Sequence, residues 1–97
     1  MTKFGELISV AKPVLIDFYT NWNDRATTID TLRNVAAALG NNAKVIKIDI
    51  EKNEILAEAL HIKENPTFMI YKNGEMLWRQ TGHKDAKNLI ETVLEYV

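Results

Sequence analysis

Cysteine is absent from all 97 residues of this sequence. Its absence excludes disulfide bonds, thiolate nucleophiles, iron–sulfur clusters and cysteine-based zinc sites together. Thiol–disulfide exchange needs an attacking sulfur atom, so these residues cannot perform it. We therefore expect no thiol chemistry. No metal and no cofactor are expected either.

Long apolar runs, an excess of one charge and low-complexity segments are missing as well. No apolar stretch approaches the roughly 20 residues of a membrane-spanning helix. The 12 basic and 13 acidic side chains are scattered and give a net charge of −1, so no basic stripe is available to neutralise phosphates. We expect neither a membrane nor a nucleic acid as partner. The first residues do not form a signal peptide, which favours a cytoplasmic location.

The first half of the chain alternates helical and strand patterns. Apolar residues at helical spacing over 4–11 predict a short helix that Pro13 ends. The nearly unbroken apolar run 14–19 is typical of a strand covered on both faces. A second helix follows, with its apolar stripe over 29–39, and the β-branched run 44–50 predicts the next strand.

The second half contains a hairpin between two helices. Asn73–Gly74, between the strand-like runs 67–72 and 75–80, is a strong hairpin signal because both turn positions need positive φ. Asn53 and Asp85 are the expected N-caps of the flanking helices. The order α-β-α-β-α-β-β-α predicts an α/β fold in which a mixed four-stranded sheet lies between two helical layers. One domain is expected over residues 1–97.

This element order, with a proline before the hairpin, resembles the thioredoxin family over nearly the whole chain. The resemblance implies a thioredoxin-like three-layer α/β/α sandwich with a cis Asn65–Pro66 bond. The residues that carry this resemblance, in chain order, are the first core strand Lys12–Tyr19 with buried Asp17, the tryptophan Trp22, the lysine Lys47, the proline loop Asn65-Pro66-Thr67, the turn Asn73–Gly74 and the following Gly82.

The sequence departs from thioredoxins where their redox chemistry takes place. Thioredoxins carry W-C-G-P-C, whereas Trp22 is followed here by Asn23, Asp24 and Arg25. Both redox positions are lost, and the segment from Trp22 to Leu32 is one residue short. The usual N-terminal strand is also missing. We interpret these differences as natural divergence and expect no disulfide reductase activity.

Asp17 has two interpretations. An ionised carboxylate inside an apolar strand is costly, and the resemblance implies a buried structural pair between Asp17 and Lys47. In redox-active relatives this aspartate serves proton transfer to a cysteine that is missing here. The alternative is a reassigned general base, because desolvation raises the pKa of a carboxylate.

The predicted binding surface combines three loops. Trp22 is either the rim of a partner site or a cap over the sheet edge. Asp24 favours the positive end of the helix dipole, so residues 23–25 either cap the second helix or contact a partner. Asp24 and His83 are together the candidates for one half of a metal-binding or acid–base site. The surface comprises Trp22, Asn23, Asp24, Arg25, Asn65, Pro66 and His83.

Three functions follow from these patterns. The preferred one is a non-catalytic adaptor or chaperone-type module that binds a protein or an extended peptide, because main-chain pairing needs no sulfur. The alternatives are an enzyme with non-thiol chemistry on Asp17, Asp24 and His83, and a structural part of a complex. His61 is expected to complement a helix C-terminus, and Trp78 either packs under a helix or forms a dimer contact.

Overall fold

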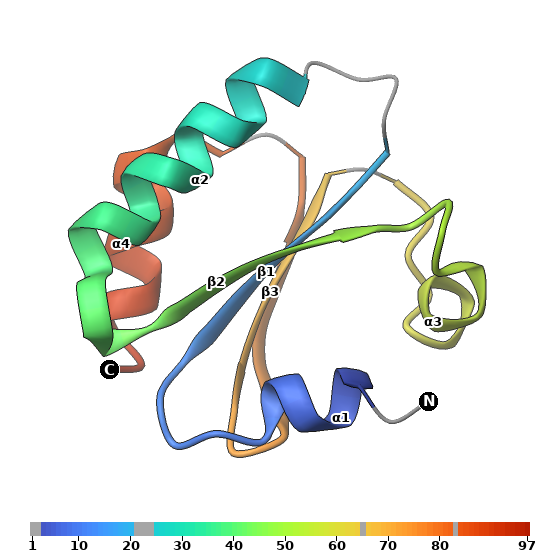
Figure 1. The fold of residues 1–97 in the computed structure, drawn as a ribbon, viewed down its shortest axis with the longest axis horizontal. Coiled ribbons are helices and arrows are strands. Elements are labelled where there is room, and N and C mark those ends of the chain that lie inside the picture. Colours follow the sequence, from blue (N-terminus) through green and yellow to red (C-terminus); the bar gives the residue numbers. More distant parts are fainter. Residues whose placement is uncertain (1–2, 21–24, 65, 83) are drawn as a thin grey trace.

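The fold is a mixed four-stranded sheet between two pairs of helices (Figure 1). The computed structural model describes residues 3–20, 25–64, 66–82 and 84–97. The elements follow the predicted order, which confirms the α/β class. They are α1 (Lys3–Ile8), β1 (Val14–Tyr19), α2 (Arg25–Leu39), a 3-10 turn (Gly40–Asn42), β2 (Lys44–Asp49), α3 (Glu54–Ala59), β3 (Thr67–Lys72), β4 (Glu75–Thr81) and α4 (Ala86–Leu94).

The strands lie in the order β2-β1-β3-β4. β1 runs parallel to β2 and antiparallel to β3, and β3 runs antiparallel to β4. β1 is therefore central, and its residues from Val14 to Phe18 are all buried. This burial on both faces explains why the apolar run of β1 is nearly unbroken.

The two faces of the sheet carry separate hydrophobic clusters. Leu15 of β1 belongs to the cluster beneath α2 and α4, together with Val35 and Leu89. Phe18 belongs to the cluster on the face of α1 and α3. Trp78 of β4 is half-buried against the first cluster, which confirms the alternative that it packs under the helices.

Of the two predicted N-caps, one is confirmed and one is wrong. The Asp85 carboxylate accepts a hydrogen bond from the Asn88 N–H at 2.8 Å and caps α4. Asn53 precedes α3, but its side chain does not cap the helix. Its amide Nδ2 instead donates to the carbonyl oxygen of Asp49 at 2.8 Å. The end of β2 supplies an acceptor that sequence reasoning could not place.

The end of α3 also differs from expectation. His61 has a φ of +58°, and the N–H groups of His61 and Ile62 donate back to the last turn of α3 at 3.1 and 2.9 Å. This arrangement is a Schellman motif, in which glycine is the usual left-handed residue. The positive charge at this helix end comes from Arg79, whose guanidinium donates to the carbonyl oxygens of Leu60 (2.5 Å) and His61 (2.8 Å).

Among the helices described, none is both long and apolar enough to cross a membrane.

Candidate functional site

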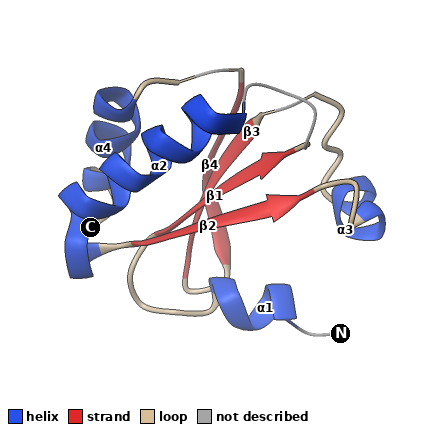
Figure 2. Cartoon of the chain, turned by 45° about the horizontal axis from the view of Figure 1, so that its top comes forward, coloured by secondary structure: helices blue, strands red, loops and turns tan. Residues whose placement is uncertain are grey.

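The carboxyl end of β1 meets the start of β3 and the end of β4. Phe18 is the register partner of Thr67, and Thr67 is the partner of Thr81. The N–H of Gly82 donates to the carbonyl oxygen of Pro66 at 2.9 Å, and Pro66 is buried. The proline loop and the Gly82 loop thus meet at one end of the sheet (Figure 2).

Most of the predicted surface lies outside the described residues. This holds for Trp22, Asn23, Asp24, Asn65 and His83, and with them for the isomer of the Asn65–Pro66 bond. Arg25 opens α2, but its side chain is not described. The roles of these residues stay predictions.

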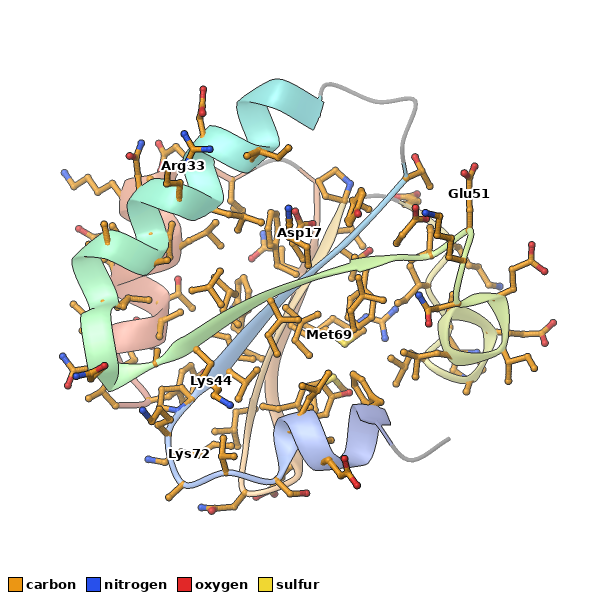
Figure 3. All side chains as sticks on the ribbon, viewed as in Figure 1. Asp17, Arg33, Lys44, Glu51, Met69 and Lys72 are labelled. Atoms are coloured by element: carbon orange, nitrogen blue, oxygen red, sulfur yellow. The ribbon has the colours of Figure 1, made fainter. Side chains whose placement is uncertain are left out.

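Asp17 is a fully buried carboxylate below this end of the sheet (Figure 3). Since side chains alternate along a strand, it shares the α2 and α4 face with Leu15. Neither carboxylate oxygen has a hydrogen-bond partner within the described part of the chain. Burial raises the pKa of Asp17 from 3.8 to about 7, against a smaller lowering by the charge of Lys47. The group therefore changes its charge near neutral pH.

Lys47 is the register partner of Asp17 across β1 and β2. Its side chain is exposed, whereas Asp17 is buried. The prediction that both residues are buried is therefore confirmed for Asp17 and wrong for Lys47. Because β2 is an edge strand, the long lysine side chain can keep its ammonium group in water. The two groups interact through charge alone, and desolvation of Asp17 outweighs that attraction.

The catalytic potential of this site rests on Asp17. A carboxyl group with a pKa near 7 is suited to proton transfer, yet it needs a reacting atom within hydrogen-bond reach. Among the described residues, no group of three or more histidine or acidic side chains could hold a metal ion. His61, at the end of α3, is exposed. Of the three residues predicted for acid–base chemistry, Asp17, Asp24 and His83, the structure describes Asp17 alone.

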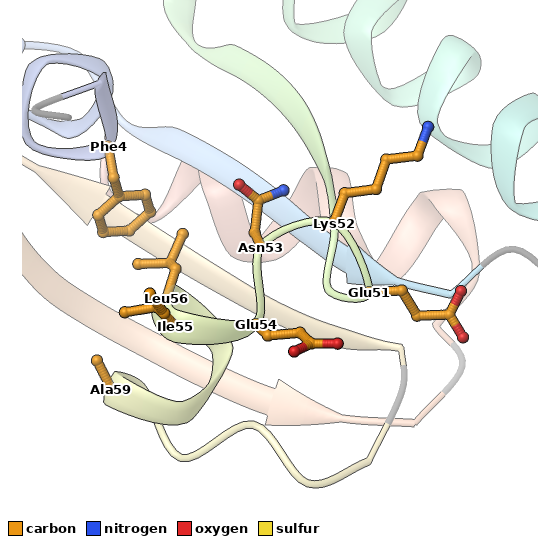
Figure 4. A pocket seen from close by; sticks show the side chains of 8 residues that line it. All are labelled: Phe4, Glu51, Lys52, Asn53, Glu54, Ile55, Leu56 and Ala59. Atoms are coloured by element: carbon orange, nitrogen blue, oxygen red, sulfur yellow. The ribbon is translucent and has the colours of Figure 1, made fainter.

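Two open hollows lie away from the predicted surface. The larger, of about 1060 Å³, lies between α1 and α3 and is lined by Phe4, Leu56 and the loop before α3 (Figure 4). The smaller, of about 260 Å³, lies between α2 and β2. Ile55 lines the larger hollow and is 85% exposed, although its place in an apolar stripe predicted burial. Successive residues of a helix point about 100° apart, so Ile55 faces solvent while its neighbour Leu56 packs against the cluster.

Comparison with known proteins identifies the family. The thioredoxin family model matches residues 1–95. This chain belongs to the thioredoxin family. A chloroplastic thioredoxin Y from Oryza sativa subsp. japonica is 37% identical over 94 residues, which cover 95% of this chain and 56% of the relative. The thioredoxin-like protein slr0233 from Synechocystis is 31% identical over 96 residues, which cover 97% of this chain and 91% of the relative.

A solved thioredoxin supports the same assignment. A mutant thioredoxin from Halobacterium salinarum superposes with a TM-score of 0.82 at 28% identity, covering 99% of this chain and 84% of that structure. The chain spans about half the length of the chloroplastic thioredoxins it matches. It is thus a thioredoxin-family domain without any cysteine.

Proposed function

We propose that this chain is a redox-inactive thioredoxin-family domain that binds a protein or an extended peptide. The observation that carries the proposal is a thioredoxin fold retained in a chain without cysteine. Disulfide exchange requires sulfur, whereas pairing of a peptide backbone with a loop does not. The junction of Pro66 with Gly82 keeps the proline loop in place without any thiol.

The proposed binding surface is the loop end of the sheet, residues 22–25, 65–66 and 82–83. Trp22 supplies a large apolar side chain of the kind enriched in binding hot spots. Arg25 offers a guanidinium group to a carboxylate of the partner, and Asn65 offers an amide that both donates and accepts hydrogen bonds. Loops at strand ends are where α/β folds usually carry their sites.

An insulin-reduction assay tests the redox half of the proposal. With dithiothreitol or a thioredoxin reductase as electron source, the chain should reduce insulin no faster than the reductant alone, because it offers no nucleophilic sulfur. A thioredoxin with its dithiol intact serves as positive control. Reduction above the uncatalysed rate contradicts the proposal.

An affinity pull-down from the native cell, followed by calorimetric titration, tests the binding half. Trp22→Ala and Arg25→Glu should each weaken binding of the captured partner by more than about 1 kcal/mol. Lys87→Glu, an exposed charge reversal on α4, is the matched control and should leave the affinity unchanged. Unchanged affinity in both loop variants, with a loss in Trp78→Ala, would place the site on β4 instead.

A second candidate function is acid–base catalysis without thiols. The raised pKa of Asp17 favours it, with Asp24 and His83 as the proposed further groups. Any turnover found for the chain should then be lost in Asp17→Asn, with a pH profile that follows a group of pKa near 7. Turnover that survives this substitution excludes Asp17 as the base.

We propose a cytoplasmic location, and chloroplastic relatives make the chloroplast the alternative. Fractionation of the native cell with an antibody against the chain distinguishes the two compartments.

A further inference from the structure

β2 has an open hydrogen-bonding edge. It is last in the strand order and pairs with β1 alone among the described strands (Figure 2). The N–H groups of Lys44 and Ile50 donate to β1 and its flank at 2.9 Å. Because backbone groups alternate in direction along a strand, Val45 and Lys47 direct their N–H and C=O groups outward. The carbonyl of Asp49 already accepts the Asn53 amide, so the open edge extends over residues 45–47.

The two faces beside this edge differ in chemistry. On the face of α1 and α3, Ile46 and Ile48 are half-buried and pack against the same hydrophobic cluster as Phe4 and Leu56. On the other face, the described residues that line the hollow of about 260 Å³ include two cationic side chains and no acidic one. Its lining residues are Ile29, Leu32, Arg33, Ala36, Val45 and Lys47.

We propose that the open edge of β2 binds an extended segment of a partner protein in which an acidic residue lies between two apolar residues. The backbone of that segment pairs with Val45 and Lys47 as an added strand. Since its side chains alternate between the faces, the acidic residue reaches Lys47 and Arg33 while its two neighbours cover Ile46 and Ile48. This surface is separate from the loop end of the proposed function.

Charge complementarity favours such a partner over a second copy of the chain. Two copies paired edge to edge would bring the Lys47 side chains together, and like charges across a strand pair are destabilising. The Arg33 Nη1 atom lies 3.6 Å from the Asp30 Oδ1 atom, but both side chains are more than 70% exposed. An exposed pair of this kind contributes little, so the guanidinium group remains available to the acidic residue.

A peptide titration followed by ¹⁵N NMR tests the proposal. The probe is acetyl-Thr-Val-Glu-Val-Thr-amide, and its control is the same peptide with lysine in place of glutamate. The largest shift changes are expected at the Val45 and Lys47 amides, and the lysine peptide should bind at least tenfold more weakly. Equal affinity for both peptides, or changes confined to the loop end, would overturn the proposal.

Variants of β2 separate the edge from general charge effects. Lys47→Glu should lower the affinity for the glutamate peptide at least tenfold. Lys44→Glu makes the same charge change on the same strand, but Lys44 lies outside the open edge and its side chain shares the opposite face with Ile46, so the affinity should change less than twofold. Equal losses in the two variants would contradict the proposal.

A third variant tests the backbone pairing. Lys47→Pro removes the outward N–H together with the ammonium group and leaves the β1–β2 hydrogen bonds intact, because proline is tolerated where an edge N–H faces solvent. Lys47→Ala, which removes the ammonium group alone, is the control. The proline variant should bind the peptide at least tenfold more weakly than the alanine variant, while circular dichroism stays unchanged in both. A mass of the unmodified chain that doubles from 11.1 kDa with concentration, and returns to that value in Lys47→Pro, would assign the edge to a second copy instead.

Discussion

The two helical layers cover the sheet unequally. α2 and α4 span 15 and 9 residues, and α4 has a side-chain cap and two fully buried apolar residues. α1 and α3 span six residues each, and α3 buries none of its own. A longer helix presents several turns of apolar stripe to a sheet, whereas a short helix depends on contacts from elsewhere. The layer of α2 and α4 desolvates Asp17 and raises its pKa. The layer of α1 and α3 leaves the apolar side chain of Ile55 exposed.

The first prediction tests the well-covered layer through Asp17. Its folded pKa of about 7 lies above its unfolded value of 3.8, so Asp17 imposes no penalty on folding below about pH 4, and the penalty grows as the pH rises toward 7. Asp17→Asn lacks this penalty. The variant should therefore gain about 4 kcal/mol on the wild type between pH 4 and pH 8.

Urea denaturation of both proteins over pH 4–8 measures this difference. Asp30→Asn is the control, since Asp30 is exposed on α2, and its difference from wild type should stay nearly constant. A gain of Asp17→Asn that shrinks with rising pH would mean that Lys47 outweighs desolvation.

The second prediction compares one leucine from each layer. Leu89→Ala on α4 should cost about 3 kcal/mol of unfolding free energy, because the side chain is fully buried and its loss leaves a cavity. Leu56→Ala on α3 should cost about half of that, since Leu56 is half-buried. Equal costs in chemical denaturation would show that the layers are equally packed.

The third prediction concerns Arg79, which connects β4 to the end of α3. Arg79→Ala should destabilise the chain by about 2 kcal/mol, because two carbonyl oxygens lose a charged donor. Hydrogen exchange should show the loss in α3 and leave α4 protected. Arg79→Lys keeps the charge but loses the paired donors, so an intermediate loss is expected. Uniform loss of protection in both helices would contradict a local role.

The fourth prediction concerns the left-handed residue that ends α3. His61→Gly should stabilise the chain by about 1 kcal/mol, because glycine adopts a φ of +58° without a Cβ clash. His61→Ala retains the Cβ and should bring no such gain. A shift of the urea midpoint measures both. If glycine destabilises, the imidazole makes a contribution that the backbone geometry does not explain.

The order of the elements was predictable because it depends on local patterns. The unbroken apolar run of β1 predicted a strand buried on both faces, and Asn73–Gly74 predicted the hairpin between β3 and β4. Asp85 was recognised as a cap because its acceptor role is satisfied three residues later. Each of these features needs only neighbouring residues. The site was less predictable, because the exposure of Lys47 and Ile55 depends on which elements cover them.

By itself, the sequence determined the absence of thiol chemistry, the family resemblance and the alternation of helices with strands. Tertiary structure alone decided that Asn53 binds Asp49 and, within the described part of the chain, that Asp17 has no hydrogen-bond partner and that β2 pairs with β1 alone. The physical reason is the distance along the chain over which each effect acts. Propensity and periodicity act over a few residues, whereas desolvation and edge exposure depend on segments brought together from distant parts of the chain.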